Sequence, residues 1–379
     1  MTYQKYRERI LNPHSKKRIL ALDGGGIRGL ITVQLLKKLE KIIQEKSNKP
    51  NARLRDYFDL IGGTSTGAII AGAITIGKTA SELDEIYRDV GRKIFKRSLL
   101  RWGIFRSRFD EKAINAALKE YFGDMTMEDT THEGVALAII SKRIDTGSVW
   151  VTDNNPEGKY YNYKEGANKD YILRKIIRAS TAAPMYFNAE RIRITQEQMG
   201  EFVDGGVSPH NNPALQLFML ATINGYQYNW KKGVDNLFIL SLGTGSWCKQ
   251  SANNINNRYK FNMSAKDAVT SLLSIMDDTD ELNRQLLQWM GKATGEVSPI
   301  DSIIGTLENE TLTPEPMFSY MRYDPTLEKD WLADKLGLNH YNDKDICNIR
   351  KMDATNTMDM LTEIGKRYAE KMIKAEHID

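Results

Sequence analysis

Short apolar runs that end in glycine and pass into a helix-like pattern recur along the chain, and they constrain its fold more than any other feature. Residues 18–23 (RILALD) end at three glycines, and residues 30–46 follow with leucine and isoleucine at helical spacing. Residues 57–63 (YFDLIGG) and the apolar segment 68–76 repeat this pattern. Strands that alternate with helices in this way predict an α/β protein with a mainly parallel sheet.

The same patterns predict elements further along the chain. Expected strands cover 134–144, 147–153, 201–206 and 236–245, and expected helices cover 81–95, 111–123, 170–180 and 212–223. The composition then changes: residues 247–262 are rich in asparagine and typical of a loop, whereas 264–291 and 354–375 have helical periodicity. We therefore expect a lead-in over 1–17, a core over 18–246, and a mainly helical C-terminal region over 247–379 packed on that core.

The composition is that of a soluble globular protein. Of the 379 residues, 41% are hydrophobic and 27% are charged, and the net charge of +4 is too small to indicate DNA or RNA binding by bulk charge. Cys248 and Cys347 form neither a metal-ligand pattern nor a disulfide framework. The N-terminal residues lack the apolar core of a signal peptide, and the run 68–76 is about half of the ~20 residues that cross a bilayer. These features predict a cytoplasmic protein.

Residues 63–67 (GTSTG) form a Gly-x-Ser-x-Gly sequence between an expected strand and an expected helix. Serine is common in ordinary glycine-rich turns, but in this context the sequence is typical of a sharp turn that exposes a nucleophile. Gly63 and Gly67 remove side chains that would clash with the strand and the helix. The Ser65 hydroxyl would then lie at a helix N-terminus, where partial positive charge favours an anion. Ser65 is therefore a candidate nucleophile.

A second glycine turn, residues 23–29 (DGGGIRG), follows the first expected strand. Its backbone N–H groups carry no side chains and could form the oxyanion hole that a nucleophilic serine needs. The same residues match the Gly-x-Gly-x-x-Gly pattern of dinucleotide-binding proteins, which also requires an acidic residue on a second strand about 20 residues later. Residues 44–52 resemble a turn rather than the end of such a strand. The dinucleotide-binding interpretation is thus the weaker alternative.

The chain offers few candidates for the base that would activate this serine. None of the five histidines follows a strand in the manner of a catalytic triad, except His210 in the segment DGGVSPHNNP. Asp204 ends an expected strand and is followed by two glycines, so it could accept the serine proton directly if burial raised its pKa. By itself, an Asp-Gly pair is more typical of a turn. Both residues remain candidates at this point.

Five motifs in this order resemble the patatin-like phospholipase family. They are ILALDGGGIRGL (19–30), YFDLIGGTSTGAIIA (57–71), ASTAAPMYF (179–187), FVDGGVSPHNNPA (202–214) and ILSLGTG (239–245). The likeness is tight over about 18–245 and looser through 318–325 and 353–370. Several ordered motifs are far more specific than any one alone. The family resemblance implies a three-layer α/β/α fold whose core, 18–246, is catalytic.

The resemblance also implies a lipid acyl hydrolase of the phospholipase A type, with a serine–aspartate dyad and no calcium or other cofactor. Ser65 would be the nucleophile and Asp204 the base, without a histidine. The oxyanion hole would comprise Gly24, Gly25, Gly26 and the adjacent Arg28. The remaining motif glycines are Gly29, Gly63, Gly67, Gly205 and Gly206. Membrane phospholipids would be the substrate, hydrolysed at the inner face of the membrane, and a homo-oligomer is a further expectation.

The chain lacks the secretion signal and the ankyrin repeats of other branches, and its compact size with a C-terminal extension resembles bacterial patatin-like effectors. Some of those are activated by a cyclic dinucleotide in antiphage defence, which implies such an activator here. Two other classes stay open: a nucleotide-dependent binding or redox protein that uses residues 24–29, and a catalytically silent membrane or signalling adaptor with the same fold.

One segment suggests a membrane-facing element. Residues 88–108 contain eight basic residues and one acid, interleaved with leucine, isoleucine, phenylalanine and tryptophan. A solvated helix face beside core aromatics explains this pattern as well as an interfacial role does. In the interfacial role, the aromatics would enter the acyl boundary and the cations, Arg97, Arg101 and Arg106 among them, would meet anionic headgroups.

Overall fold

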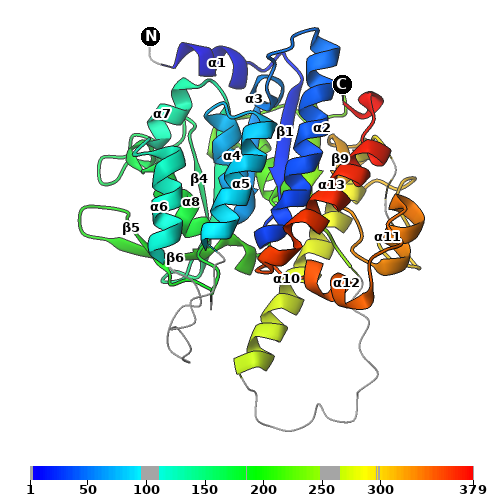
Figure 1. Cartoon of the computed structure of the whole chain (residues 1–379). Coiled ribbons are helices and arrows are strands. Elements are labelled where there is room, and N and C mark those ends of the chain that lie inside the picture. Colours follow the sequence, from blue (N-terminus) through cyan, green and yellow to red (C-terminus); the bar gives the residue numbers. More distant parts are fainter. Residues whose placement is uncertain are drawn as a thin grey trace.

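The computed structural model describes residues 3–94, 111–184, 186–247, 265–295, 297 and 299–378. Within these residues, nine strands form one sheet in the order β5-β6-β3-β2-β1-β7-β9-β8, with β4 paired to β3 beside this path. The pairs among β3, β2, β1, β7, β9 and β8 are parallel, whereas β4, β5 and β6 join antiparallel at one side. The predicted mainly parallel α/β sheet is therefore confirmed (Figure 1).

Through residue 246, the elements that were expected have bounds close to the expected ranges, and four further elements, at 4–10, 54–57, 127–132 and 190–193, were not anticipated. The strands are β1 (Lys17–Leu22), β2 (Leu60–Thr64), β3 (Ala136–Arg143), β4 (Ser148–Asp153), β5 (Glu190–Arg193), β6 (Met199–Asp204), β7 (Leu237–Leu242), β8 (Lys292–Ala293) and β9 (Ser319–Tyr323). The helices are α1 (Gln4–Ile10), α2 (Gly29–Ser47), α3 (Leu54–Tyr57), α4 (Thr66–Thr75), α5 (Ala80–Ile94), α6 (Glu111–Phe122), α7 (Met127–His132), α8 (Leu173–Ser180), α9 (Ala214–Thr222), α10 (Ala265–Met290), α11 (Lys329–Leu336), α12 (Asp343–Ile349) and α13 (Met358–Met372). Short 3₁₀ turns include η1 (Gly26–Arg28) and η3 (Gly205–Val207).

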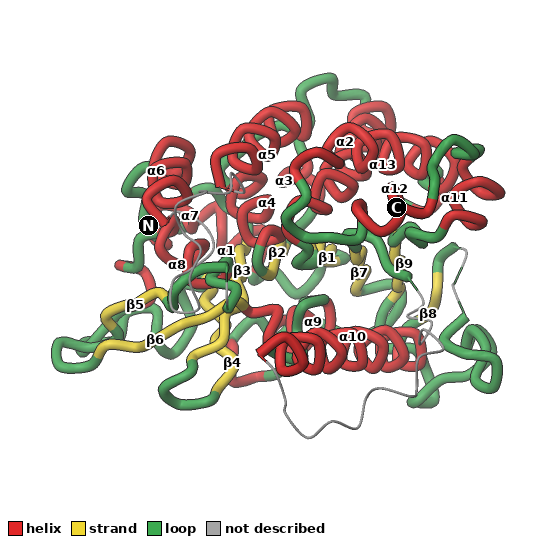
Figure 2. The backbone as a smooth tube through the Cα atoms, turned by 60° about the horizontal axis from the view of Figure 1, so that its bottom comes forward, coloured by secondary structure: helices red, strands yellow, loops and turns green. Residues whose placement is uncertain are grey.

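Helices cover both faces of the sheet, as Figure 2 shows. On one face lie α2, α4, α5, α6, α8 and α13, and on the other lie α9 and α10. In β1, Leu20 and Leu22 belong to the first apolar layer, and Ile19 and Ala21 belong to the second. A strand buried on both faces reads as a continuous apolar run, which is why the central strands were recognisable in the sequence. This is the three-layer α/β/α arrangement.

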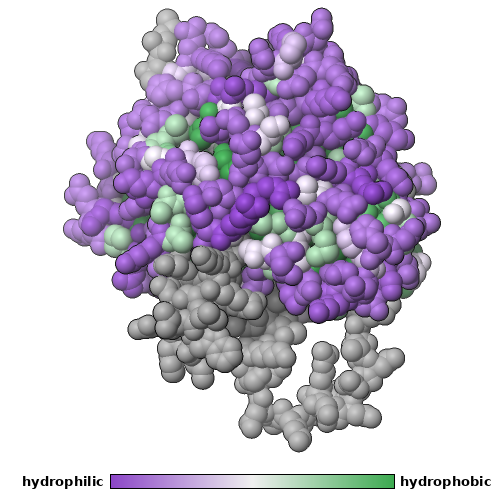
Figure 3. All heavy atoms as spheres, viewed as in Figure 1, coloured by the Kyte–Doolittle hydropathy of each residue, from purple (hydrophilic) through white to green (hydrophobic). Residues whose placement is uncertain are grey.

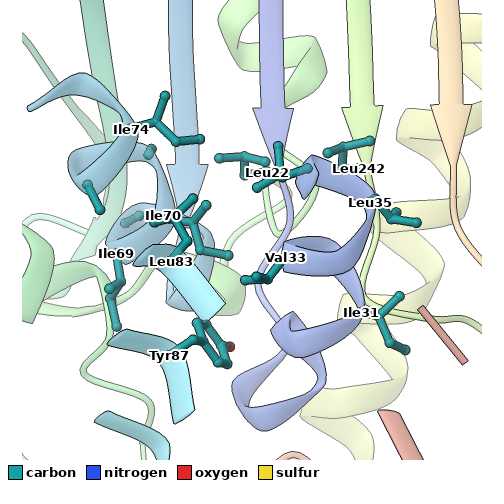
Figure 4. Close-up of a cluster of buried hydrophobic side chains, with 14 of the residues drawn as sticks. Leu22, Ile31, Val33, Leu35, Ile69, Ile70, Ile74, Leu83, Tyr87 and Leu242 are labelled. Atoms are coloured by element: carbon teal, nitrogen blue, oxygen red, sulfur yellow. The ribbon is translucent and has the colours of Figure 1, made fainter. Parts of the chain in front are cut away.

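The larger apolar layer fixes the turns at the carboxyl ends of β1 and β2. Figure 4 shows Ile31, Val33 and Leu35 of α2 beside Leu22 and Leu242, with Ile69, Ile70 and Ile74 of α4 alongside. All of these side chains are buried. Each contributes about 1.5–3 kcal/mol by burial, so the starts of α2 and α4 are held firmly against the strands that precede them.

The C-terminal region is helical, as expected, and it also completes the sheet. Its strand β9 pairs with β7, with Phe238 opposite Ser319 and Leu242 opposite Tyr323. Its helix α13 packs along α2, where Gly365 lies against the backbone of Ile31. The two strands of this region were not anticipated, and the division into 18–246 and 247–379 stays a prediction about domains.

Most of the basic and aromatic segment predicted to face a membrane, 88–108, lies outside the described residues, which resume at residue 111 after a gap that begins at residue 95. Three of its cations, Arg88, Arg92 and Lys93, are described within α5. Arg88 pairs with Asp84 and Asp359, and Lys93 pairs with Asp89 and Glu120. Among the described residues, no helix combines the length and the apolar character needed to span a bilayer. The face in Figure 3 is largely hydrophilic, with small separate hydrophobic groups.

Candidate active site

The strands β1, β2 and β6 end close together in the middle of the sheet, and their ends bring the candidate residues into one place. β2 lies between β1 and β3, and Thr64 at the end of β2 is level with Ile140 of β3. β6 runs antiparallel to β3, and its last residue, Asp204, is paired with Ser141, next to Ile140. The antiparallel return of β6 therefore places Asp204 beside the turn that follows Thr64.

The turn between β2 and α4 holds Ser65 in a strained backbone conformation. Ser65 has φ 56° and ψ −123°, a region that side-chain-bearing residues rarely adopt. A side chain on Gly63 would overlap the backbone of Gly67, and one on Gly67 would overlap the carbonyl oxygen of Leu22. The two glycines are therefore required by close backbone packing, as the sequence predicted. Strain of this kind is found where a functional group must be aimed.

Ser65 and Asp204 are in direct contact. The Ser65 Oγ donates a hydrogen bond of 2.6 Å to Asp204 Oδ2, and the N–H of Gly206 donates to Asp204 Oδ1 at 2.7 Å. Asp204 is only 5% exposed. Both carboxylate oxygens are thus occupied, and one of them points at the hydroxyl hydrogen that a general base would remove.

Burial raises the pKa of Asp204 to about 6, against the lowering effects of Ser65, Gly206 and the Arg178 charge. A carboxylate with this pKa is still ionised at neutral pH, and it is a stronger base than an exposed aspartate. The arrangement can therefore remove a proton from Ser65 without an imidazole between the two groups.

Ser180, at the end of α8, fixes the backbone of Ser65. The N–H of Ser65 donates to Ser180 Oγ at 2.8 Å, and Ser180 Oγ donates to the Ile140 carbonyl at 2.5 Å. Ser180 was not among the predicted site residues, although it lies within the motif ASTAAPMYF. Its contact also means that the Ser65 amide is not available as an oxyanion donor.

The glycine turn after β1 lies beside Ser65, and its carbonyl groups are all held. The Gly24 carbonyl accepts from Thr244 Oγ1, the Gly25 carbonyl from the Arg28 N–H, and the Gly26 carbonyl from the Tyr87 hydroxyl. Fixed carbonyls fix the directions of the N–H groups that follow them in the same peptide planes. The turn is therefore a rigid set of donors.

The three amides of this turn differ in availability. The Gly24 N–H donates to the Asn211 carbonyl and the Gly25 N–H to Thr66 Oγ1, each at 3.2 Å. In the part of the chain that is described, the Gly26 N–H has no acceptor, and neither does the Thr66 N–H, the first of α4. An amide following the nucleophile is a known type of oxyanion donor, so the Gly-x-Ser-x-Gly pattern could have identified Thr66 as well.

Arg28, predicted to belong to the oxyanion hole, supports the glycine turn. Its guanidinium donates to the Gly245 carbonyl at 3.0 Å and to the Gly25 carbonyl at 3.4 Å, and it lies 4.9 Å from the centre of the Trp247 ring. Gly29 is packed against the Tyr87 hydroxyl, and Gly205 against the Ile140 carbonyl. These motif residues therefore have packing and hydrogen-bonding roles in the turns around Ser65 and Asp204.

His210, the other candidate base, contributes its backbone. Its carbonyl accepts from the Thr64 hydroxyl at 2.6 Å, directly before the nucleophile. Among the described residues, its ring Nδ1 has no hydrogen-bond partner, and burial lowers the pKa of the ring. The Ser65 hydroxyl donates to Asp204 and not to this ring.

Charged side chains from the C-terminal region lie directly behind the glycine turn. Arg322 of β9 donates to Asp23 Oδ2 at 2.7 Å and to Asp324 Oδ2 at 2.9 Å. Burial raises the pKa of Asp23 to about 8, and Arg322 opposes this rise. Arg322 and Asp324 lie in the segment 318–325, but their place at the site was not predictable because it depends on the pairing of β9 with β7.

No group of histidine, cysteine, aspartate and glutamate side chains within the described ranges could hold a metal ion. The site consists of backbone N–H donors, the Ser65 hydroxyl and the Asp204 carboxylate. This set is suited to acyl transfer through a tetrahedral oxyanion.

Comparison with known proteins gives a consistent result over the part of the chain that carries this site. A family model for patatin-like phospholipases matches residues 20–218, just over half of the chain. Patatin-15 and patatin-B1 of Solanum tuberosum are each 33% identical over 245 residues, which is 60% of this chain and 60% of each relative. The match thus spans less than two thirds of these curated relatives. The crystal structure of VipD from Legionella pneumophila aligns with a TM-score of 0.38 and 9% identity, covering 92% of this chain and 67% of that one.

Proposed function

Since this chain belongs to the patatin-like phospholipase family, we propose that it is a serine hydrolase that cleaves acyl esters of phospholipids. Ser65 is the nucleophile and Asp204 the general base. The observation that carries the proposal is the 2.6 Å hydrogen bond from the Ser65 hydroxyl to a buried carboxylate at a strained strand-to-helix turn.

In the first half of the reaction, Asp204 accepts the hydroxyl proton as Ser65 Oγ forms a bond to the ester carbonyl carbon. The carbonyl oxygen becomes an oxyanion, and the amides of Gly26 and Thr66 are the donors available for it. Collapse of this intermediate breaks the bond to the alcohol oxygen of the lipid. Asp204 returns its proton to that oxygen, and the acyl group remains on Ser65.

Water completes the cycle by the same route. Asp204, again a carboxylate, accepts a proton from the water that attacks the acyl carbon, and the second oxyanion forms at the same donors. Its collapse breaks the acyl–Oγ bond, releases a fatty acid and returns the proton to Ser65. Neither half needs a metal ion or another cofactor, so we propose a cofactor-independent phospholipase of the A type.

The membrane and cellular parts of the proposal rest on the sequence. The protein acts from the cytoplasm at the inner membrane face, and the basic segment 88–108 brings it to anionic lipid. Neutralising Arg97, Arg101 and Arg106 should weaken vesicle binding and spare hydrolysis of a soluble ester. Loss of both activities would indicate a structural role.

A narrower proposal concerns activation by a cyclic dinucleotide in bacterial antiphage defence. Its support is the mainly helical C-terminal region beyond the family motifs. Hydrolysis that stays unchanged with each member of a panel of cyclic dinucleotides would remove it.

The two other functional classes are less well supported. Dinucleotide binding at residues 24–29 would require free amides, but those of Gly24 and Gly25 already donate within the protein. A silent adaptor would have no need for a hydroxyl kept at positive φ and bonded to a carboxylate.

The decisive assay measures fatty acid release from phospholipid vesicles and hydrolysis of a soluble ester side by side. We expect Ser65→Ala and Asp204→Asn to lower both rates by about 10³-fold or more. Ser47→Ala, at the far end of α2, makes the same chemical change as Ser65→Ala outside the site and should match the unmodified protein. Equal hydrolysis by the Ser65→Ala and Ser47→Ala variants would contradict the proposal.

A further inference from the structure

Helix α10 runs beneath the sheet and reaches the candidate site with two polar side chains. Figure 2 shows α10 alongside α9, and its final turn is anchored there by Leu287 and Met290. Earlier in the helix, Asp280 and Asn283 contact the loop 209–212. The helix also lies beside η3, which carries Gly206, the donor to the Asp204 carboxylate.

The loop 209–212 connects all parts of the site. The His210 carbonyl binds the hydroxyl of Thr64, the residue before the nucleophile. The Asn211 carbonyl accepts the N–H of Gly24. The Asn211 Oδ1 atom occupies the space that a side chain on Gly24 would need, and it lies against Gly206 as well. A shift of this loop would therefore move the glycine turn relative to Ser65 and Asp204.

Asp280 determines how this loop is held. Its Oδ2 accepts from Asn211 Nδ2 at 2.8 Å, and its Oδ1 accepts from the Asn212 N–H at 3.1 Å. By binding the amide nitrogen of Asn211, the carboxylate directs the opposite atom, Oδ1, toward the two glycines. Both contacts require an acceptor, and a carboxylate supplies one for each without any donor of its own.

We propose that Asp280 is a positioning residue for the oxyanion donors, so that the C-terminal region completes the catalytic geometry. This inference rests on the proposed hydrolase function. Asp280 touches no reacting atom. It acts through Asn211, whose carbonyl and side chain fix the glycine turn, and its loss displaces the donors without altering the nucleophile or the base.

The test uses the full chain and a soluble ester. Asp280→Asn places an amide N–H against one of two donors, so one of the two hydrogen bonds is lost. We expect kcat to fall by about 10- to 100-fold, less than the ~10²–10³-fold cost of removing an oxyanion donor outright. KM should change by less than about threefold, and the pH midpoint of kcat should stay in place, because the base is untouched. Asp278→Asn, the same change at an exposed position of α10, is the matched control.

A double-mutant cycle separates positioning from a general loss of structure. Asn211→Ala should lower kcat to a similar extent, and the combination with Asp280→Asn should be no worse than the poorer single variant. Additive losses, a shifted pH midpoint, or a kcat within twofold of the Asp278→Asn control would each overturn the inference. If the unmodified protein hydrolyses the ester through Ser65 while Asp280→Asn is normal, this inference alone fails. An inactive unmodified protein overturns it together with the proposed function.

Discussion

Two adjacent strand-to-helix turns, after β1 and after β2, have similar backbone architecture but present different chemical groups. Each contains one residue at positive φ, Gly26 at 59° and Ser65 at 56°. After β1 that residue is a glycine, and the turn offers backbone N–H groups. After β2 it is a serine, and the turn offers a hydroxyl. Of the two, only the turn after β2 therefore places a residue with a side chain at positive φ, and that residue is the proposed nucleophile.

The two turns also differ in what makes their glycines necessary. In the β2 turn, Gly63 and Gly67 face backbone atoms, which cannot move aside. In the β1 turn, Gly24 and Gly25 face the side chains of Asn211 and Thr244, whereas Gly26 faces the Met352 carbonyl. The β2 turn is thus fixed by backbone atoms around the sheet itself. The β1 turn is fixed largely by residues from distant parts of the chain.

The largest loss of turnover is expected at Ser65. Two variants of this residue distinguish the role of its hydroxyl from the cost of its backbone conformation. Ser65→Ala and Ser65→Gly both remove the hydroxyl, so each should lower turnover by about 10³-fold or more. The glycine variant should nevertheless be the more stable of the two by about 1 kcal/mol, because alanine keeps a Cβ at φ 56°. Urea unfolding of both variants measures this difference. A more stable alanine variant would mean that the turn after β2 is not strained.

A smaller effect is expected when a side chain is introduced at Gly26 in the turn after β1. Gly26→Ala forces a Cβ against the Met352 carbonyl, so turnover should fall by about 10²-fold and the free energy of unfolding by about 1–3 kcal/mol. Gly123→Ala has a similar φ of 55° but open space around it. It should cost about 1 kcal/mol of stability and leave turnover unchanged. Equal turnover in the two variants would show that the β1 turn takes no part in catalysis.

The sequence was sufficient to predict the parts of the site that are local in the chain. Ser65 and its glycines are defined by neighbours within a few residues, and the central strands by continuous apolar runs. Asp204 followed from the lack of a convincing histidine together with the family motif. Both turns could be predicted from the order of strand, glycines and helix alone.

Contacts between distant segments were not predictable in the same way. β9 carries Arg322 in a short strand, and its place in the sheet depends on pairing with β7, far away in the chain. Ser180, Arg322 and Asp280 are ordinary helix or strand residues until tertiary packing brings them to the site. Arg28 was predicted to belong to the oxyanion hole, and its hydrogen bond to the Gly245 carbonyl depends on the loop after β7. Such roles depend on geometry that local sequence does not encode.

The central claim is that a buried carboxylate, without an imidazole, activates Ser65. The most direct test is the rate at which a fluorophosphonate ester labels the protein across pH 5–8, with the labelled residue identified by mass spectrometry. Burial raises the pKa of Asp204 to about 6, and the base acts only when ionised. We therefore predict labelling at Ser65 that is slow below pH 6, rises through this midpoint, and is lost in Asp204→Asn. Labelling of another residue, or a rate at Ser65 that does not depend on pH or on Asp204, would contradict the claim.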